Sequence, residues 1–118
     1  ALHIQYSPAL VLGTSTTLQA GLYQQALARR GLQMCNTEET QPVVNRLLQS
    51  IKTQTADLPS RCDELRAHVE QIEVKNVIIA CTDLNAAPLV FPAGTTVIDA
   101  TQVLAVATVH RWLAWVGR

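Results

Sequence analysis

The stretch that decides the fold is Val77-Ile78-Ile79-Ala80, which runs directly into Cys81-Thr82-Asp83. A short, continuous run of β-branched and apolar residues that stops at polar ones is typical of a buried parallel strand. Ala9-Leu10-Val11-Leu12 and Thr96-Val97-Ile98 have the same character. Leu32 to Met34 predicts one further, short strand. The sequence therefore predicts about four strands.

Helical patterns separate these strands. One helix is expected from the N-caps at Thr14 and Ser15 to a C-cap at Gly31, because apolar residues recur at helical spacing between them. Further helices are expected to begin at Pro42 and at Ser60. A final helix is expected after Asp99. Its expected buried positions are Val103, Leu104, Ala107, Leu113 and Val116.

Strands that alternate with helices predict a parallel sheet, because parallel neighbours need crossover connections and these are usually helices. We therefore expect an α/β, three-layer, flavodoxin-like fold with helices on both faces of the sheet. A chain of 118 residues, of which 48% are hydrophobic and 15% charged, can bury one ordinary core. Residues 1–118 are expected to form a single domain.

The amino-acid composition limits the kinds of partner and cofactor that we expect. Nine Lys and Arg balance nine Asp and Glu without a basic run, so no nucleic-acid partner is expected. Apolar runs are too short to span a bilayer, and we expect a soluble, cytoplasmic protein with no membrane partner. The three cysteines lack metal-site spacing and a neighbouring His cluster, so reduced thiols and no metal are expected.

Polar residues follow three of the predicted strands. Because the carboxyl ends of parallel strands meet at one edge of a sheet, we expect Thr14, Cys81 and Asp99 to cluster there, the first two within about 15 Å of each other. Two interpretations stay open for each group. Cys81 is a reactive thiol or an inert small hydrophobe, and the Gly13–Thr17 turn holds a carboxylate or simply caps a helix.

Three stretches together resemble the second half of the aspartate/glutamate racemase family. Leu12-Gly13-Thr14-Ser15-Thr16-Thr17, followed by Gly21-Leu22-Tyr23 and Arg30-Gly31, is similar to that family's Leu-Gly-Thr-x-x-Thr stretch. Ile79-Ala80-Cys81-Thr82-Asp83-Leu84 resembles its Gly-Cys-Thr-Glu motif, and Val97-Ile98-Asp99-Ala100-Thr101 resembles the strand and helix start that follow. The order and separation of the stretches agree with the family as well.

The resemblance implies one half of a two-domain, cofactor-independent amino-acid racemase, in which the substrate lies between two α/β halves with one cysteine on each side of its α-carbon. By position, Cys81 would be one acid/base. The substrate, an amino acid or dicarboxylate, would be held by residues that follow the first and central strands. These expected substrate-binding residues are Thr14, Ser15, Thr17, Thr82 and Asp83.

This sequence departs from the family pattern in three respects. Ala80 stands where the family usually has Gly, and Asp83 where it usually has Glu, which puts the reach of that carboxylate in doubt. The first half, with its own cysteine, has no counterpart here. Cys35-Asn36-Thr37 resembles the first-half motif but follows a different strand, so we interpret it as coincidence.

Two function classes remain. The first is a racemase relative whose site is completed by another chain, so that the isolated chain is weakly active or inactive. The alternative is a non-catalytic carboxylate-binding or interaction module. A homo-oligomer, and specifically a homodimer, is expected because the last helix carries more apolar residues than one face needs, Trp112 and Trp115 among them.

Overall fold

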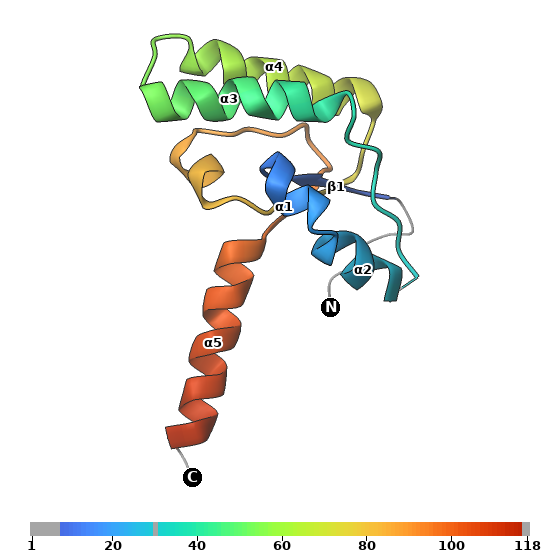
Figure 1. Ribbon diagram of the computed structural model, residues 1–118, viewed down its shortest axis with the longest axis vertical. Coiled ribbons are helices and arrows are strands. Elements are labelled where there is room, and N and C mark those ends of the chain that lie inside the picture. The colour runs from blue at the N-terminus through green and yellow to red at the C-terminus, as the bar shows by residue number, and fades with distance from the viewer. Residues whose placement is uncertain (1–7, 30, 117–118) are drawn as a thin grey trace.

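The computed structural model describes residues 8–29 and 31–116, and for residues 101–106 it describes the backbone alone. Parallel strands alternate with helices, which confirms the α/β class (Figure 1). The elements in chain order are β1 (Ala9–Leu12), α1 (Ser15–Gln19), α2 (Leu22–Arg29), α3 (Thr40–Thr53), α4 (Leu58–Ile72), β2 (Asn76–Ile79), the 3₁₀ helix η1 (Thr82–Ala86), β3 (Thr96–Asp99) and α5 (Ala100–Val116).

The sheet has the order β1-β2-β3, and both pairs of strands are parallel. All residues of β1 and β2 are buried, as expected for strands without polar side chains along most of their length. Successive side chains of these strands point to opposite faces of the sheet and belong to two separate cores. Leu10, Leu12, Val77 and Ile79 pack against α3 and α4, whereas Ala9, Val11 and Ile78 pack with Leu27 of α2.

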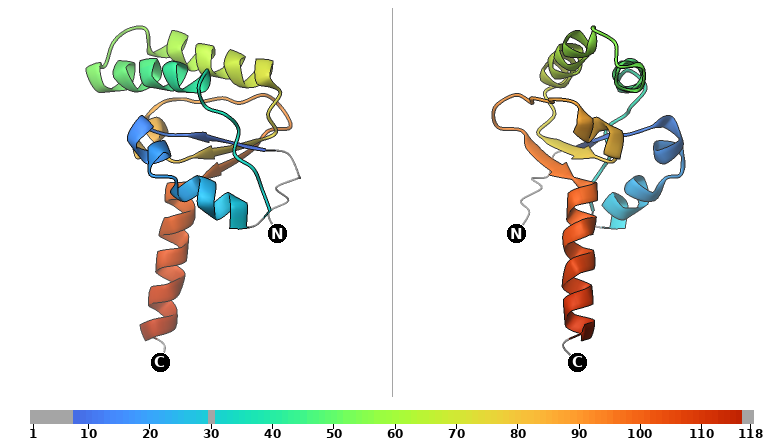
Figure 2. Two further views of the ribbon diagram at one scale, coloured as in Figure 1. Left: turned by 45° about the vertical axis from the view of Figure 1, so that its right-hand side comes forward. Right: turned by 90° about the vertical axis from the view of Figure 1, so that its left-hand side faces the viewer.

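Figure 2 shows the resulting layers, with α3 and α4 over one face of the sheet and α1 and α2 beside the other. The layer of α3 and α4 is the more complete, because the apolar face of α3 is fully buried over residues such as Val44 and Leu47. This confirms the flavodoxin-like layout with helices on both faces.

The fourth predicted strand is reduced to one bridge, so the sheet has three strands in the described part of the chain. Met34 pairs with Ala9, whose N–H donates to Gln33 O at 2.9 Å and whose carbonyl accepts from Cys35 N at 2.8 Å. The chain then leaves the sheet, because the Asn36 side chain accepts a hydrogen bond from the Glu38 N–H and forms a tight turn.

The single helix expected up to Gly31 is two helices, α1 and α2. The break lies at Ala20 and Gly21, where Gly21 adopts φ 76°. That left-handed conformation ends a helix and suits glycine, which carries no Cβ to clash with the following carbonyl group.

The expected burial of the last helix is wrong for the positions that the structure describes. Ala107, Leu113 and Val116 are exposed, and the side chains of Val103 and Leu104 lie outside the described set. Figure 2 shows the reason: α5 leaves the sheet at its first residues and projects away from the body. The molecule measures 51 Å along its longest axis but only 32 and 29 Å across.

None of the helices in the described ranges combines the length and the apolar character that crossing a bilayer requires.

The connection between α3 and α4 is closed by the Asp57 carboxylate. It accepts hydrogen bonds from the Thr55 hydroxyl, from Ser50 Oγ at 2.7 Å and from Arg61 Nε at 3.1 Å. The hydroxyl groups of Thr55 and Ser50, followed by Arg61, lower the pKa of Asp57 from 3.8 to about 2. Donors that favour the ionised form in the folded state make this carboxylate a stabilising group.

We predict that Asp57→Asn lowers the free energy of unfolding at neutral pH. We also expect this free energy to fall less steeply with acidification in the variant than in the wild type. The pKa of Asp57 is lower in the folded state than in the unfolded state. Its contribution to the free energy of unfolding is therefore complete above pH 3.8 and is lost as the pH falls towards about 2. Urea unfolding at a series of pH values measures this. Asp63→Asn, at an exposed position of the same helix, is the control; an equal loss in both variants would contradict the assignment.

Candidate functional site

The carboxyl ends of the strands lie side by side. Leu12 pairs with Ile79, and Ile79 pairs with Asp99, so one row of residues closes all three strands. One residue further, the Ala80 N–H donates to Leu12 O at 2.8 Å. The polar residues that follow β1 and β2 therefore leave the sheet at the same level, and Asp99 stands at the end of the third strand.

Thr14 and Cys81 are near neighbours across this edge. A Cβ built on Gly13 would lie 3.5 Å from the Ala80 Cβ. Adding standard bond lengths and one Cα step on each side limits the distance between the Cα atoms of Thr14 and Cys81 to about 14 Å. The expected clustering is therefore met, while the roles of these residues stay a prediction.

The turn after β1 is held by hydroxyl groups. Thr14 is the N-cap of α1, and its Oγ1 accepts from the Thr17 N–H at 3.1 Å. Its Oγ1 also lies 2.9 Å from Thr17 Oγ1. Two hydroxyls that share one hydrogen bond use one of their two protons, so the pair keeps one donor for a ligand oxygen. Ser15, half-buried, opens the helix beside them.

Gln41 is a residue of this site that sequence reasoning missed. From the first turn of α3, its Nε2 donates to Gly13 O at 2.9 Å and to Asn45 Oδ1 at 3.0 Å. Gln41 thus fixes the turn after β1 to the helix layer. Gln41 and Gly13 are 28 residues apart, and no spacing rule links an amide on one helix to a distant carbonyl.

The thiol of Cys81 lies at the start of the segment that follows β2. Cys81 is half-buried in an extended conformation and is the N-cap of η1. Thr82 and Asp83 come next, and both are exposed. Leu84 is fully buried and packs into the core under α3, which fixes the position of this short helix. Cys81, Thr82 and Asp83 therefore lie at the sheet edge. Burial of the neighbouring Leu84 holds them there.

The other two thiols have different environments. Burial raises the pKa of Cys35, and burial together with the nearby Asp63 carboxylate raises the pKa of Cys62. Cys62 is 8% exposed and belongs to the core of α3 and α4. A raised pKa keeps a thiol protonated and unreactive, so neither cysteine has the environment of a catalytic base.

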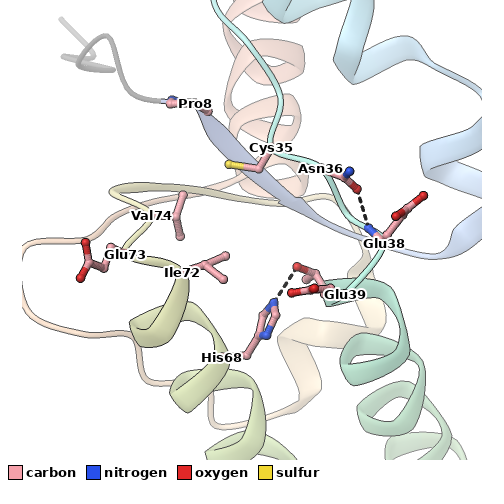
Figure 3. A pocket seen from close by; sticks show the side chains of 10 residues that line it. Pro8, Cys35, Asn36, Glu38, Glu39, His68, Ile72, Glu73 and Val74 are labelled. Carbon is pink, nitrogen blue, oxygen red and sulfur yellow. Dashed lines mark hydrogen bonds between the residues drawn. The ribbon is translucent and has the colours of Figure 1, made fainter.

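Cys35 lines a cavity of about 350 Å³ at the opposite end of the strands (Figure 3). Pro8, just before β1, and Val74, just before β2, mark its position. Within it, the buried Thr40 hydroxyl lies 2.7 Å from His68 Nε2, so this contact links α3 to α4. None of the predicted site residues lines this cavity.

No group of three or more His, Cys, Asp or Glu side chains in the described ranges is placed to hold a metal ion.

The fold and the strand-end cluster define an α/β protein with a thiol, a carboxyl group and paired hydroxyls at one sheet edge. No family model matches the chain. Over 113 residues it is 33% identical to the broad specificity amino-acid racemase RacX of Bacillus subtilis (strain 168). The alignment covers 91% of this chain but 48% of RacX, so the chain spans about half the length of that relative. A resemblance to one half of a racemase predicts an alignment of this extent.

We predict that Thr14→Ala lowers the free energy of unfolding by about 1 kcal/mol, because the first turn of α1 loses the side-chain acceptor for the Thr17 N–H. Thr14→Ser keeps a hydroxyl and should restore most of the loss. Urea unfolding measures both. Thr16→Ala, at an exposed position of the same helix, is the control. If it costs as much as Thr14→Ala, the cap does not explain the effect.

Proposed function

We propose that the chain belongs to the aspartate/glutamate racemase family and contributes one half of a cofactor-independent amino-acid racemase site. The observation that carries the proposal is the 33% identity to RacX over 113 residues. The strand-end cluster supports it, because the residues that carry the resemblance lie on adjacent strand ends. The substrate is an amino acid or a dicarboxylate.

In this proposal Cys81 exchanges the proton on the α-carbon. Its thiolate takes the α-proton and becomes a thiol, while the electron pair of the broken C–H bond stays on the substrate as a carbanion. The thiol then returns a proton to that carbon and becomes a thiolate again. Thr14 and Thr17 would offer a hydroxyl donor to a substrate carboxylate. We assign Ser15, Thr82 and Asp83 to the same binding place because they follow the same two strand ends.

One thiol can serve only one face of the α-carbon. Inversion needs a second acid or base on the opposite face, and the environments of Cys35 and Cys62 do not suit either for that role. We therefore assign the second group to another chain. A lone half-site would exchange the α-hydrogen with solvent while it retains the configuration, and it would racemise slowly or not at all.

All three cysteines are free thiols, and the proposed chemistry requires Cys81 to stay reduced. A cytoplasmic location would provide the reducing conditions.

We predict slow loss of the α-proton NMR signal when the purified chain is incubated with L-aspartate or L-glutamate in deuterated water. Chiral chromatography of the same samples should show retained configuration. Cys81→Ser should abolish exchange, because a hydroxyl is too weak an acid to replace the thiol. Circular dichroism establishes that each variant is folded.

Cys35→Ser is the matched control, since Cys35 is also half-buried but lies at the far end of the strands. It should keep full exchange activity. Equal loss in the two variants would show that Cys81 has no special role.

A second candidate function is a carboxylate-binding module without catalysis. Its support is the Thr14 and Thr17 pair, which offers a hydroxyl donor whether or not a second acid/base is present. Binding of L-aspartate or L-glutamate by calorimetry, without any exchange of the α-hydrogen, would favour this function over the racemase half-site.

A further inference from the structure

The turn after β1 is tied to the helix layer by a side chain, just where the pairing of the strands ends. The carbonyl of Leu12 accepts from the Ala80 N–H at 2.8 Å. The next carbonyl, that of Gly13, accepts from Gln41 Nε2 at 2.9 Å. Gln41 lies in the first turn of α3, a helix fixed to the core by fully buried residues such as Val44. The donor is therefore firmly placed.

The amide group of Gln41 is itself held in one orientation. A carbonyl oxygen can only accept, so the NH2 end of the amide has to face Gly13. The second proton of the same NH2 group goes to Asn45 Oδ1 at 3.0 Å, one turn further along α3. Both donors of the amide are therefore used, and the two bonds fix the amide between the helix and the turn.

The bond to Gly13 acts on the hydroxyl pair through one rigid unit. A peptide group is planar, so the Gly13 carbonyl moves together with the nitrogen and Cα atoms of Thr14. Thr14 carries the Oγ1 that accepts from the Thr17 N–H at 3.1 Å and lies 2.9 Å from the Thr17 hydroxyl oxygen. A restraint on the carbonyl is therefore also a restraint on the hydroxyl pair.

Glycine at position 13 gives the turn little stiffness of its own. The φ of Gly13 lies outside the left-handed region. A Cβ built there would meet Ala80 Cβ at 3.5 Å and Thr17 Cγ2 at 3.6 Å, which are ordinary contacts. Neither strain nor lack of space demands glycine here, yet glycine leaves the backbone more conformations than any other residue. Gln41 supplies the restraint that the backbone lacks.

We propose that Gln41 is a positioning residue for carboxylate binding, which holds the hydroxyl pair of Thr14 and Thr17 in the arrangement that offers a donor to the ligand. This assignment rests on the proposed function, in which that pair binds a carboxylate of the substrate. Gln41 acts through the turn after β1, whereas Cys81 follows β2. Its loss should therefore weaken binding and leave the exchange rate at saturating substrate close to that of the wild type.

Gln41→Met tests the restraint. Methionine is similar in length to glutamine, is neutral and has a similar helix propensity, but it cannot donate a hydrogen bond. Gln49→Met is the matched control, because Gln49 is an exposed residue of the same helix. The double variant Gly13→Ala/Gln41→Met tests the mechanism, since alanine narrows the backbone freedom that Gln41 otherwise restrains. Circular dichroism establishes that each variant is folded.

Two quantities are measured for each variant. NMR relaxation gives the backbone order parameters of residues 13–17, and NMR titration gives the affinity for L-aspartate and L-glutamate. Gln41→Met should lower the order parameters and weaken binding on the order of two- to tenfold, as for the loss of one hydrogen bond. Gln49→Met should match the wild type in both quantities. The double variant should recover part of both losses.

Four results would overturn the positioning role. These are unchanged order parameters in Gln41→Met, an equal loss in Gln49→Met, no recovery in the double variant, and a slower exchange rate at saturating substrate with unchanged affinity. A wild-type chain that binds neither amino acid would instead overturn the proposed carboxylate site. Normal binding by the wild type with unchanged order parameters in Gln41→Met would overturn the positioning role alone, so the two proposals fail separately.

Discussion

The parallel pairing of β1 with β2 is the constraint on which the rest of the molecule depends. Residues 9–12 and 76–79 are far apart in the chain, yet they pair without a shift and are buried over their whole length. A register slip of one residue would turn Leu10 and Leu12 away from α3 and α4. The same register brings Gly13 against Ala80, and with them the two polar turns of the candidate site.

The strands were predictable because their signals are local. Val77–Ala80 is apolar, and the polar residues after it mark where the strand ends, so the sequence also locates Cys81 at the sheet edge. The helix break at Gly21 was not predicted, because apolar residues continue at helical spacing across it and a glycine inside a helix costs only about 1 kcal/mol. The role of Gln41 was not predicted, because its hydrogen bond to Gly13 joins residues that are far apart in the sequence.

The last helix shows a different limit of sequence reasoning. An apolar helical pattern says that a surface must be covered, but not by what. Leu113 and Val116 were expected to be buried, and in the single chain they are exposed. The sequence of this helix was interpreted correctly as having more apolar residues than one face needs, since Trp112 and Trp115 are also exposed. A periodicity rule cannot separate burial within a chain from burial between chains.

The candidate site is one-sided because it is built on the carboxyl-end edge of the sheet. All of its groups come from one layer of strand ends, so they can contact a ligand from one side only. In the proposed function, a substrate carboxylate at this edge would meet the one free hydroxyl donor of the Thr14 and Thr17 pair, and the Cα–H bond would meet the Cys81 thiol. The opposite face of a bound amino acid would remain in water unless another surface closes over it. Racemisation demands a proton donor on that open face. In the proposed function, the missing acid or base would therefore have to lie on this open side of the strand ends.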